Sequence, residues 1–372
     1  MLKKISIFML GAALVFTLVA CPKSEEKEAG ENVSDGIPTM RLVTDKTGIS
    51  DKSFNASAWK GILNFYGDSI DNTTKRGKKY DVVTCPTQDA YLSVLKSTSD
   101  QEFDLVCMTG FTFADSAQAV AELYPNQKYM IADVTWLSAP NLMQIAFAEH
   151  EGSYLVGLAT ALKAKEDGIV NPKFGFIGGM PGSTITKFEI GYIQGIKAVF
   201  PDAEILDYYA NDWGKPELAK TQAKNWFDSG VYAIFSAAGA TGNGTIAQAK
   251  EYRMNDKNVW AIGVDSDQYE AGLYADGESA VLTSMLKKVD MATKYALDSV
   301  KDGTFKGEKV VLDLAKEGLG FSVKNKALSE SIVAEVESAK KDIIAGNIKV
   351  FATYAAALEA GVAPEGLGAK DD

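Results

Sequence analysis

Short runs of β-forming apolar residues alternate along this chain with longer stretches in which apolar residues recur every three or four positions. Apolar residues at that spacing are typical of one face of a helix. The predicted strands of the first series are 40–44, 80–83, 103–107 and 129–132, and the helical stretches among them are 54–66, 91–99 and 113–123. A series in which helices separate strands predicts a parallel sheet covered by those helices.

The alternation starts again after 144–147, so the sequence predicts a second parallel sheet. Its predicted elements are a helix over 153–165, a strand over 174–178, a helix ending near 200, strands over 205–209, 232–236 and 259–264, and helices over 218–227 and 245–252. Two such series in tandem predict an α/β protein with two lobes. An apolar run at 281–285 and helices over 289–300 and 329–345 follow, and we expect these helices to cross back between the lobes.

The length of the chain also favours two lobes. The chain has 372 residues, of which 46% are hydrophobic, and this length exceeds what one hydrophobic core usually serves. The predicted organisation is a signal peptide (1–20), a lipid-anchored flexible tether (21–38), an N-terminal lobe (39–149 with about 286–303), a C-terminal lobe (150–285 with about 304–350) and a C-terminal tail (351–372).

The first residues have the three parts of a secretory signal. Lys3 and Lys4 precede an apolar run over 5–20, which is shorter than the roughly 20 residues that a spanning helix needs. Cys21 follows the small residue Ala20 at the expected cleavage point, so we predict that Cys21 is lipidated; a secreted or uncleaved N-terminus with an incidental cysteine is the alternative. The protein is then expected at the cell membrane, anchored by lipid and facing the periplasm or the exterior.

Charge and cysteine content restrict the possible partners. The formal net charge is −11, and the sequence has no basic cluster interleaved with aromatic residues, so nucleic-acid binding through phosphate contacts has no visible source. Besides Cys21, the chain has Cys85 and Cys107 in strand-like runs, which we interpret as two buried, unpaired thiols.

Polar and aromatic residues follow several of the predicted strands. In open parallel sheets, ligands bind at the carboxyl ends of the strands. The first strand leads to Asp45 and to a loop in which Ser53 is predicted to cap the next helix and Phe54 lies on its first turn. The strand ending at 264 leads to Asp265, which could accept two vicinal sugar hydroxyls. Core packing of Phe54 and a capping role for Asp265 are the alternatives.

Enzymatic motifs are incomplete. The glycine-rich turn over 236–244 matches neither the dinucleotide-binding fingerprint nor the P-loop. His150 is the only histidine, and no nucleophile elbow of the Gly-x-Ser-x-Gly type is present to complete a triad with it. The pair Asp265 and Asp267 on a loop is weak evidence for acid–base catalysis. We therefore expect a protein that is not an enzyme and that holds no cofactor and no metal.

Several segments, taken in order, resemble one known family. They are 43–45, 51–55, 151–157, 239–244, 263–265 and 283–287. On these motifs the chain, from about 40 to about 350, resembles the basic membrane protein family of lipoproteins, which includes purine nucleoside receptors that feed ABC transporters. The resemblance departs at His150 and in the turn over 211–216, neither of which receives a ligand role.

The resemblance implies a fold and a ligand site. The fold is the two-lobed type I periplasmic-binding-protein fold, with the ligand cleft between the lobes. A purine nucleoside (adenosine, guanosine or inosine) would lie there with its base stacked between Phe54 and Phe235. Asp265 would bind the ribose hydroxyls with Lys287 nearby, and Asp45 would contact the polar side of the ligand. Asn55 and Gly239 complete the predicted site.

The resemblance also implies partners and a mechanism. The lobes are expected to close over the ligand about hinges near 148–151 and 285–288, and the closed form would be recognised by an ABC permease and its ATPase subunits. Three other functions remain open: a binding protein for another small polar solute such as a sugar, a nucleotide-cofactor enzyme, and a surface adhesin on the same fold.

Overall fold

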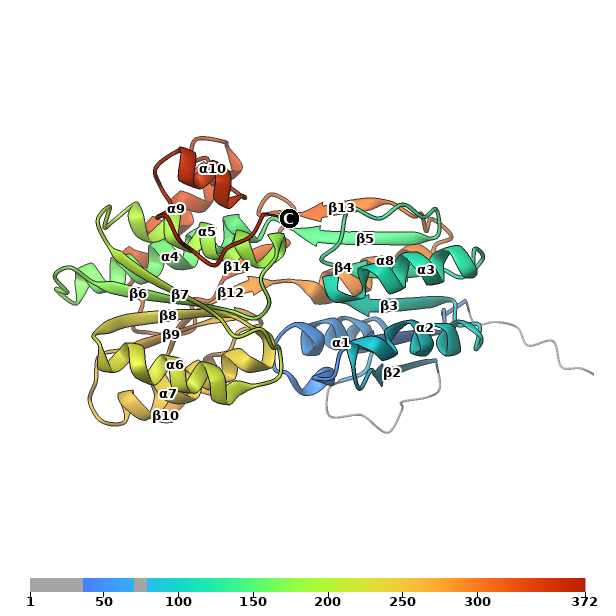
Figure 1. Ribbon diagram of the computed structural model, residues 1–372, viewed down its shortest axis with the longest axis horizontal. Helices are drawn as coiled ribbons and strands as arrows, with labels where there is room; N and C mark the ends of the chain where they lie inside the picture. The colour runs from blue at the N-terminus through green and yellow to red at the C-terminus, as the bar shows by residue number, and fades with distance from the viewer. Residues whose placement is uncertain (1–35, 70–78, 372) are drawn as a thin grey trace, which may run out of the picture. The chain divides into compact units, whose positions relative to one another are not determined.

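The computed structural model describes residues 36–69 and 79–371. The predicted signal peptide, Cys21 and all but the last residues of the predicted tether lie outside the described residues. The chain divides into two units, Met1–Gly36 and Ile37–Asp372, and the second unit contains both sheets (Figure 1). The following paragraphs concern this second unit.

Two six-stranded sheets organise this unit. The first has the order β13-β5-β4-β3-β1-β2, and all its neighbouring strands are parallel. Its strands are β1 (Met40–Thr44), β2 (Tyr80–Thr84), β3 (Leu105–Thr109), β4 (Tyr129–Ala132), β5 (Leu142–Phe147) and β13 (Lys309–Leu312). We call this sheet and the helices packed on it the N-terminal lobe.

The second sheet has the order β14-β12-β9-β8-β6-β7 and is parallel except for β14. Its strands are β6 (Lys173–Gly178), β7 (Glu204–Tyr209), β8 (Val231–Ala237), β9 (Trp260–Asp265), β12 (Val281–Lys287) and β14 (Leu319–Phe321). A short hairpin, β10 (Leu273–Ala275) with β11 (Glu278–Ser279), lies between β9 and β12 in the sequence. With its helices, this sheet forms the C-terminal lobe, so the predicted fold class is confirmed.

Helices pack against both sheets and against one another. Their bounds are α1 (Phe54–Phe65), α2 (Tyr91–Ser99), α3 (Ala114–Leu123), α4 (Glu149–Glu166), α5 (Ser183–Lys197), α6 (Pro216–Asp228), α7 (Asn243–Arg253), α8 (Val289–Lys301), α9 (Glu330–Ile344) and α10 (Tyr354–Glu359). In the N-terminal lobe α1 packs on α8, and in the C-terminal lobe α4 packs on α5 and α9. The described cysteines, Cys85 and Cys107, are buried and unpaired, as predicted.

The contact between α4 and α5 depends on glycine. A Cβ atom placed on Gly157 would lie 2.3 Å from the carbonyl oxygen of Tyr192, and one placed on Gly191 would lie 2.2 Å from the carbonyl oxygen of His150. No real side chain fits at such distances, so the two helices can approach this closely only where the side chain is absent. His150 is thus part of a tight helix contact.

The chain crosses between the lobes three times. The crossings are Phe147–Glu149 from β5 to α4, Lys287–Val289 from β12 to α8, and Leu312–Leu319 from β13 to β14. The first two lie in the segments predicted as hinges. The third holds the others together, because Ala148 N donates to the carbonyl of Leu312 at 3.0 Å and Lys288 N donates to that of Gly318 at 2.9 Å.

The third crossing corrects one predicted boundary. The sequence prediction placed 304–350 in the C-terminal lobe, yet β13 pairs with β5 in the sheet of the N-terminal lobe. The prediction was wrong for this strand because its four residues, Lys-Val-Val-Leu, are partly exposed and too few to show a burial pattern. Strand β14 and helix α9 do belong to the C-terminal lobe.

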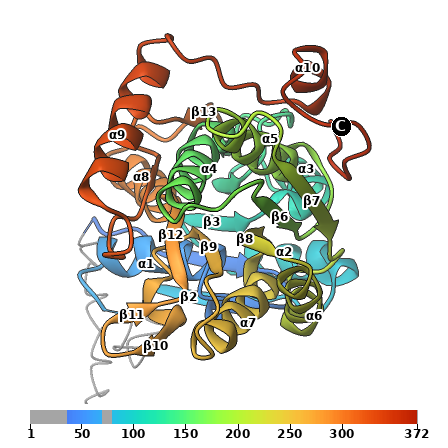
Figure 2. The same cartoon turned by 90° about the vertical axis from the view of Figure 1, so that its left-hand side faces the viewer.

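The C-terminal segment packs on α5 (Figure 2). Helix α10 contacts α5, and the residues after α10 are bonded to the same face of the lobe. Gly368 N donates to Asp207 Oδ2 at 2.5 Å, and Lys370 N donates to Thr186 Oγ1 at 2.8 Å. Beside them, the buried carboxyl of Glu189 accepts a 2.5 Å hydrogen bond from the hydroxyl of Tyr209. Burial raises the pKa of Glu189 to about 8.

The raised pKa of Glu189 predicts a pH-dependent stability. The folded protein keeps a proton on Glu189 between about pH 4.5 and pH 8 that the unfolded chain releases, so this group lowers the free energy of unfolding as pH rises through that window. Glu189→Gln keeps the acceptor for Tyr209 and removes the charge. We expect it to raise the free energy of unfolding by on the order of 3 kcal/mol at pH 8.5 and by little at pH 5.

Urea unfolding at the two pH values measures this difference. The matched control is Glu335→Gln on α9, because Glu335 is exposed. Equal effects of Glu189→Gln at both pH values would contradict the prediction.

Candidate functional site: a cavity between the two sheets

One cavity is lined by residues from both lobes, most of them at the carboxyl ends of strands. The N-terminal lobe contributes Asp45, Thr47, Asp51, Phe54, Asn55, Thr109, Gly110, Phe111, Thr112 and Asp133, and the C-terminal lobe contributes Ile185, Phe188, Trp213, Ala237, Ala238, Gly239, Val264, Asp265 and Lys287. All the predicted ligand residues except Phe235 are in this lining. Whether they bind a ligand stays a prediction.

Phe235 does not line the cavity, so its predicted stacking role is wrong. Its side chain is fully buried within β8, with its ring 5.7 Å from that of Phe176, 6.2 Å from that of Phe188 and 5.3 Å from that of Tyr192. The residues that reach the cavity from this strand are at and beyond its end, Ala237 and Ala238. Phe235 supports Phe188, which does line the cavity.

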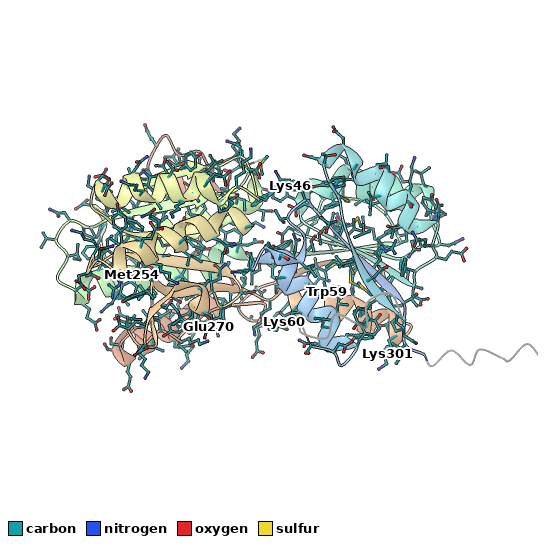
Figure 3. The ribbon with its side chains drawn as sticks, turned by 90° about the horizontal axis from the view of Figure 1, so that it is seen from below. Lys46, Trp59, Lys60, Met254, Glu270 and Lys301 are labelled. Atoms are coloured by element: carbon teal, nitrogen blue, oxygen red, sulfur yellow. The ribbon has the colours of Figure 1, made fainter. Side chains whose placement is uncertain are left out.

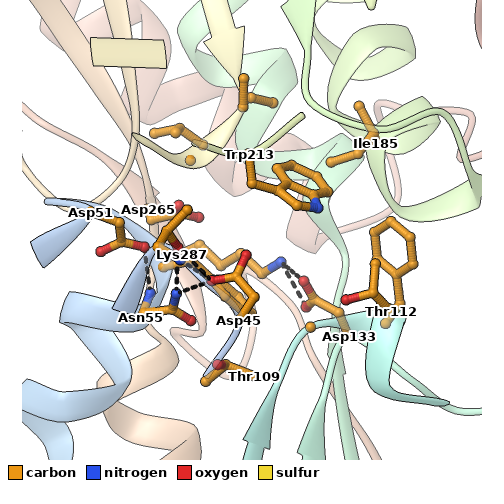
Figure 4. Close-up of a pocket in the computed structure, with 18 of the residues that line it drawn as sticks. Asp45, Asp51, Asn55, Thr109, Thr112, Asp133, Ile185, Trp213, Asp265 and Lys287 are labelled. Atoms are coloured by element: carbon orange, nitrogen blue, oxygen red, sulfur yellow. Dashed lines mark hydrogen bonds and ion pairs between the residues drawn. The ribbon is translucent and has the colours of Figure 1, made fainter. Parts of the chain in front are cut away.

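The C-terminal lobe presents two aromatic side chains to the cavity, Phe188 and Trp213. Trp213 lies in the turn after β7, across the pocket from Asp45 and Asn55 (Figure 4). Its indole ring contacts Phe111 of the N-terminal lobe edge to face, with ring centroids 6.0 Å apart. The sequence reasoning gave this turn no ligand role. Ligands bind beyond the carboxyl ends of parallel strands, and this rule points to the turn that follows the predicted strand over 205–209.

The start of α1 is arranged differently from the sequence prediction. Asp51, not Ser53, caps the helix: its carboxylate accepts from the backbone N–H groups of Ser53, Asn55 and Ala56 at 2.8–3.1 Å. The Ser53 hydroxyl instead donates a short hydrogen bond to Asp265 Oδ2 in the C-terminal lobe. The two functions are thus divided between neighbouring side chains.

Asp45 and Asn55 form a second polar group in the N-terminal lobe. The Asn55 amide nitrogen donates to Asp45 Oδ1 and to Thr47 Oγ1, both at 3.0 Å. Thr47 N also donates to Asp45 Oδ1 at 3.1 Å. These bonds fix the orientation of the Asn55 amide and use both of its N–H groups, and Asp45 Oδ2 accepts from no protein group among the described residues. The pair can therefore present two acceptors to a ligand, Asp45 Oδ2 and the amide oxygen of Asn55.

Lys287 is the only basic side chain in the described lining, and it is completely enclosed. Its ammonium group lies 2.7 Å from Asp133 Oδ1 and 3.0 Å from Glu149 Oε1. It also lies 4.9 Å from the ring centroids of both Phe54 and Phe147. Glu149 is paired in addition with Lys187 at 3.2 Å.

Burial and charge set the protonation of this group. Burial alone would lower the pKa of Lys287, but the carboxylates of Asp133, Glu149 and Asp265 raise it above its usual value, so the ammonium stays charged. Burial raises the pKa of Asp133. Burial likewise raises the pKa of Asp265 to about 7, although Lys287 and the Ser53 hydroxyl act in the opposite direction. Asp265 is therefore the cavity carboxyl that titrates near neutral pH.

Four residues of the described lining, Gly110, Asp133, Gly239 and Asp265, have a positive φ. Asp265 has φ 63° and Gly239 has φ 56°, so the chain turns sharply where β9 ends and where the glycine-rich turn begins. In the residues that the structure describes, no three His, Cys, Asp or Glu side chains are placed to hold a metal ion. Four aromatic side chains, several carboxyl groups and one ammonium line this cavity, a combination suited to a small polar organic ligand.

The lobes also meet outside the cavity. Lys46 Nζ lies 2.9 Å from Asp212 Oδ2, which joins the loop after β1 to the turn after β7. Figure 3 shows Lys46 at this junction and Trp59 inside the N-terminal lobe. Because half of the Lys46 side chain is exposed, this ion pair contributes little to stability.

Comparison with known proteins identifies the family. Residues 40–353 match the model of the family described as ABC transporter substrate-binding protein, PnrA-like. The chain belongs to this family. The CD4+ T-cell-stimulating antigen of Listeria innocua is 36% identical over 341 residues, with 90% of this chain and 94% of that protein covered.

Two further relatives of this PnrA-like protein extend the comparison. The ABC transporter nucleoside-binding protein BmpA of Lactococcus lactis is 32% identical over 354 residues, with 93% of this chain and 98% of that protein covered. The crystal structure of an ABC transporter solute-binding protein from Aeropyrum pernix superposes with a TM-score of 0.74 at 27% identity, covering 87% of this chain and 98% of that one. Family and fold therefore agree with the resemblance found in the sequence.

The length and apolar content of the described helices bear on whether any of them could cross a membrane. Among residues 36–69 and 79–371, no helix of this PnrA-like protein has the length and apolar content to cross a bilayer.

The position of Phe235 predicts a stability effect without an affinity effect. Phe235→Ala leaves a cavity beneath Phe188 and should lower the free energy of unfolding by about 3–5 kcal/mol. Because the side chain does not reach the binding cavity, the folded fraction should keep its affinity for ligand within about twofold. Phe235→Leu, with a smaller loss of volume, is the variant for titration if the alanine variant is poorly folded. A large loss of affinity in a stably folded Phe235→Leu would contradict this placement.

Proposed function

We propose that this PnrA-like protein binds purine nucleosides and delivers them to an ABC permease. The observation that carries the proposal is the pair of aromatic side chains, Phe54 and Trp213, presented to one cavity from opposite lobes beside the carboxyl of Asp265. The nucleoside-binding relative from Lactococcus lactis supports the ligand class.

The two aromatic rings suit a flat base. Stacking on aromatic side chains contributes about 1–3 kcal/mol per base. Phe54 belongs to the N-terminal lobe and Trp213 to the C-terminal lobe, so a base held between them links the lobes. In this proposal Trp213 takes the place that the sequence prediction gave to Phe235.

The polar side chains suit the sugar and the base edge. Asp265 accepts the ribose hydroxyls through its carboxylate oxygens, with the Lys287 ammonium nearby to balance the charge. Asp45 and Asn55, which are bonded to each other at 3.0 Å, offer their remaining oxygens as acceptors to the ligand, and Gly239 allows its backbone to approach closely. Hydrogen bonds to charged groups contribute about 1.5–3 kcal/mol each.

The charge of the lining separates nucleosides from nucleotides. The described lining carries the carboxyl groups of Asp45, Asp51, Asp133 and Asp265 against the single ammonium of Lys287, which Asp133 and Glu149 already pair. A phosphate would meet repulsion and no free cation. The ligand is therefore a neutral nucleoside.

Transport requires partners beyond this chain. Closure of the lobes about the crossings at Phe147–Glu149 and Lys287–Val289 presents a surface to the permease, which works with ATPase subunits. Lipidation at Cys21 holds the protein at the membrane, facing the periplasm or the exterior. Neither a catalytic step nor a cofactor is part of this function.

A ligand panel tests the proposal. Isothermal titration of protein that has been unfolded and refolded to remove bound ligand should show heat with adenosine, guanosine or inosine, and none with ribose, cytidine or adenosine monophosphate. Phe54→Leu and Trp213→Leu should each weaken nucleoside affinity by about fivefold to a hundredfold, the loss of one stacking contact. Phe235→Leu is the matched control.

Three other results of this panel would favour a different function or contradict part of the proposal. Binding of ribose that survives Trp213→Leu would favour a sugar-binding protein, whereas heat with none of these compounds in a folded protein would leave the adhesin reading. Tight binding of the monophosphate would contradict the argument from charge.

The pKa of Asp265 predicts how affinity depends on pH. Ribose hydroxyls donate to the ionised carboxylate, and the protonated form, present below about pH 7, must first lose its proton. Nucleoside affinity should therefore fall as pH decreases below 7, by up to about tenfold per pH unit. Asp265→Asn should bind more weakly and lose this dependence. Titrations between pH 5.5 and 8.5 measure both effects, and identical pH profiles for the two proteins would contradict the role of Asp265.

A further inference from the structure

The loop of residues 51–53 is bonded to the C-terminal lobe at each of its positions. Asn243 Nδ2 donates to the carbonyl of Asp51 at 3.0 Å, and Gln268 Nε2 donates to the carbonyl of Lys52 at 3.1 Å. The hydroxyl of Ser53 donates to Asp265. Three consecutive residues of one lobe thus meet two segments of the other, the start of α7 and the residues at the end of β9. We call 51–53 the clasp loop.

The two amide donors are held firmly in the C-terminal lobe. Gln268 is buried, its Oε1 accepts from Val264 N at 3.0 Å, and its backbone N–H donates to Ser284 Oγ at 3.1 Å. Asn243 is the first residue of α7, directly after the glycine-rich turn. The Gln268 amide is therefore aimed at the clasp loop by contacts within its own lobe, and the Asn243 amide is placed there by its position at the start of α7.

The clasp loop is equally firm in the N-terminal lobe. The Asp51 carboxylate binds the first N–H groups of α1, and Lys52 holds a left-handed backbone with φ 58°. Phe54 and Asn55 follow at once on the first turn of α1. Whatever holds the clasp loop therefore also places these two cavity residues relative to Asp265.

We propose that Asn243 and Gln268 are positioning residues that clasp the lobes together and set their closed population without touching the ligand. Neither side chain is part of the cavity lining. Their bonds to the clasp loop exist only while the lobes are together, and in an open form the freed carbonyls and amides bind water. The net gain of each bond is consequently small, which keeps closure reversible.

The proposal gives the glycine-rich turn a function. The turn resembles a phosphate-binding loop in composition, but it delivers the Asn243 amide to the backbone of the opposite lobe. The effect on binding is kinetic as well as thermodynamic, because bonds that form between the lobes after the ligand has entered slow its release. The inference concerns closure and holds for any small ligand of this cavity.

The test uses Asn243→Ala and Gln268→Glu in the full chain purified in detergent. Asn243→Ala removes one inter-lobe donor, since Asn243 Oδ1 has no hydrogen-bond partner among the described residues. Gln268→Glu keeps an oxygen for Val264 N and removes the donor to Lys52. The matched control is Asn255→Ala just beyond the C-terminal end of α7, because the Asn255 amide donates at 2.7 Å to the carbonyl of Glu251 in the same lobe.

Two measurements report on the clasp. Hydrogen exchange of the ligand-free protein should become faster in peptides covering 47–56 and 264–269 for both variants, and should be unchanged at 91–99 and in Asn255→Ala. Stopped-flow kinetics with adenosine, guanosine and inosine should show dissociation about fivefold faster for each variant, the effect of one hydrogen bond, with little change in association.

The hydrogen-exchange measurement can support or overturn the proposal. Unchanged exchange at 47–56 in both folded variants would overturn the proposal, as would faster exchange across the whole C-terminal lobe, which indicates a merely structural role. If the parent protein binds no nucleoside, the proposed function fails, while the exchange of the ligand-free protein still decides whether the clasp exists.

Discussion

The buried ammonium of Lys287 is the constraint on which the rest of the site depends. Lys287 ends β12 at one crossing between the lobes, Glu149 begins α4 at another, and Asp133 follows β4 in the N-terminal lobe. A buried charge without partners is very costly, so the ion pairs at 2.7 Å and 3.0 Å hold these three chain positions together. Replacing a buried ion pair with apolar side chains of similar volume often leaves stability unchanged. Stability alone therefore does not account for these charged residues, and we infer that they serve binding.

In the proposed function, the same arrangement explains why a polar cavity favours a neutral ligand over an anion. The Lys287 ammonium is already paired with Asp133 and Glu149, so it is not available to a phosphate. Asp265, next to it, has a pKa of about 7 because burial outweighs the attraction of the ammonium. A neutral ligand with hydroxyl groups fits this balance. The aromatic residues Phe54 and Trp213 then add affinity without adding charge.

Much of the fold was predictable because both sheets are parallel except for β14. Buried parallel strands and the helices between them leave strong periodic patterns, and these gave the order of the elements and the carboxyl-end residues Asp45, Phe54 and Asp265. Short or irregular features left no such pattern: β13 has four partly exposed residues, and Trp213 lies in a turn. The stacking role of Phe235 came from the family resemblance, and no sequence pattern distinguishes an aromatic residue that faces a ligand from one that packs behind the lining, as Phe235 does behind Phe188.

Contacts within the cavity and contacts beside it act on binding in different ways. Phe54, Trp213 and Asp265 line the cavity, so in the proposed function they determine which ligand is held. Asn243 and Gln268 bind only backbone carbonyls of the clasp loop, at 3.0 Å and 3.1 Å, and are indifferent to the ligand. Both kinds of contact contribute to affinity, because the free energy of lobe closure adds to the free energy of the ligand's own contacts. A protein built in this way can change its ligand through the lining while keeping its lobe closure, and can change its release rate through the clasp while keeping its ligand.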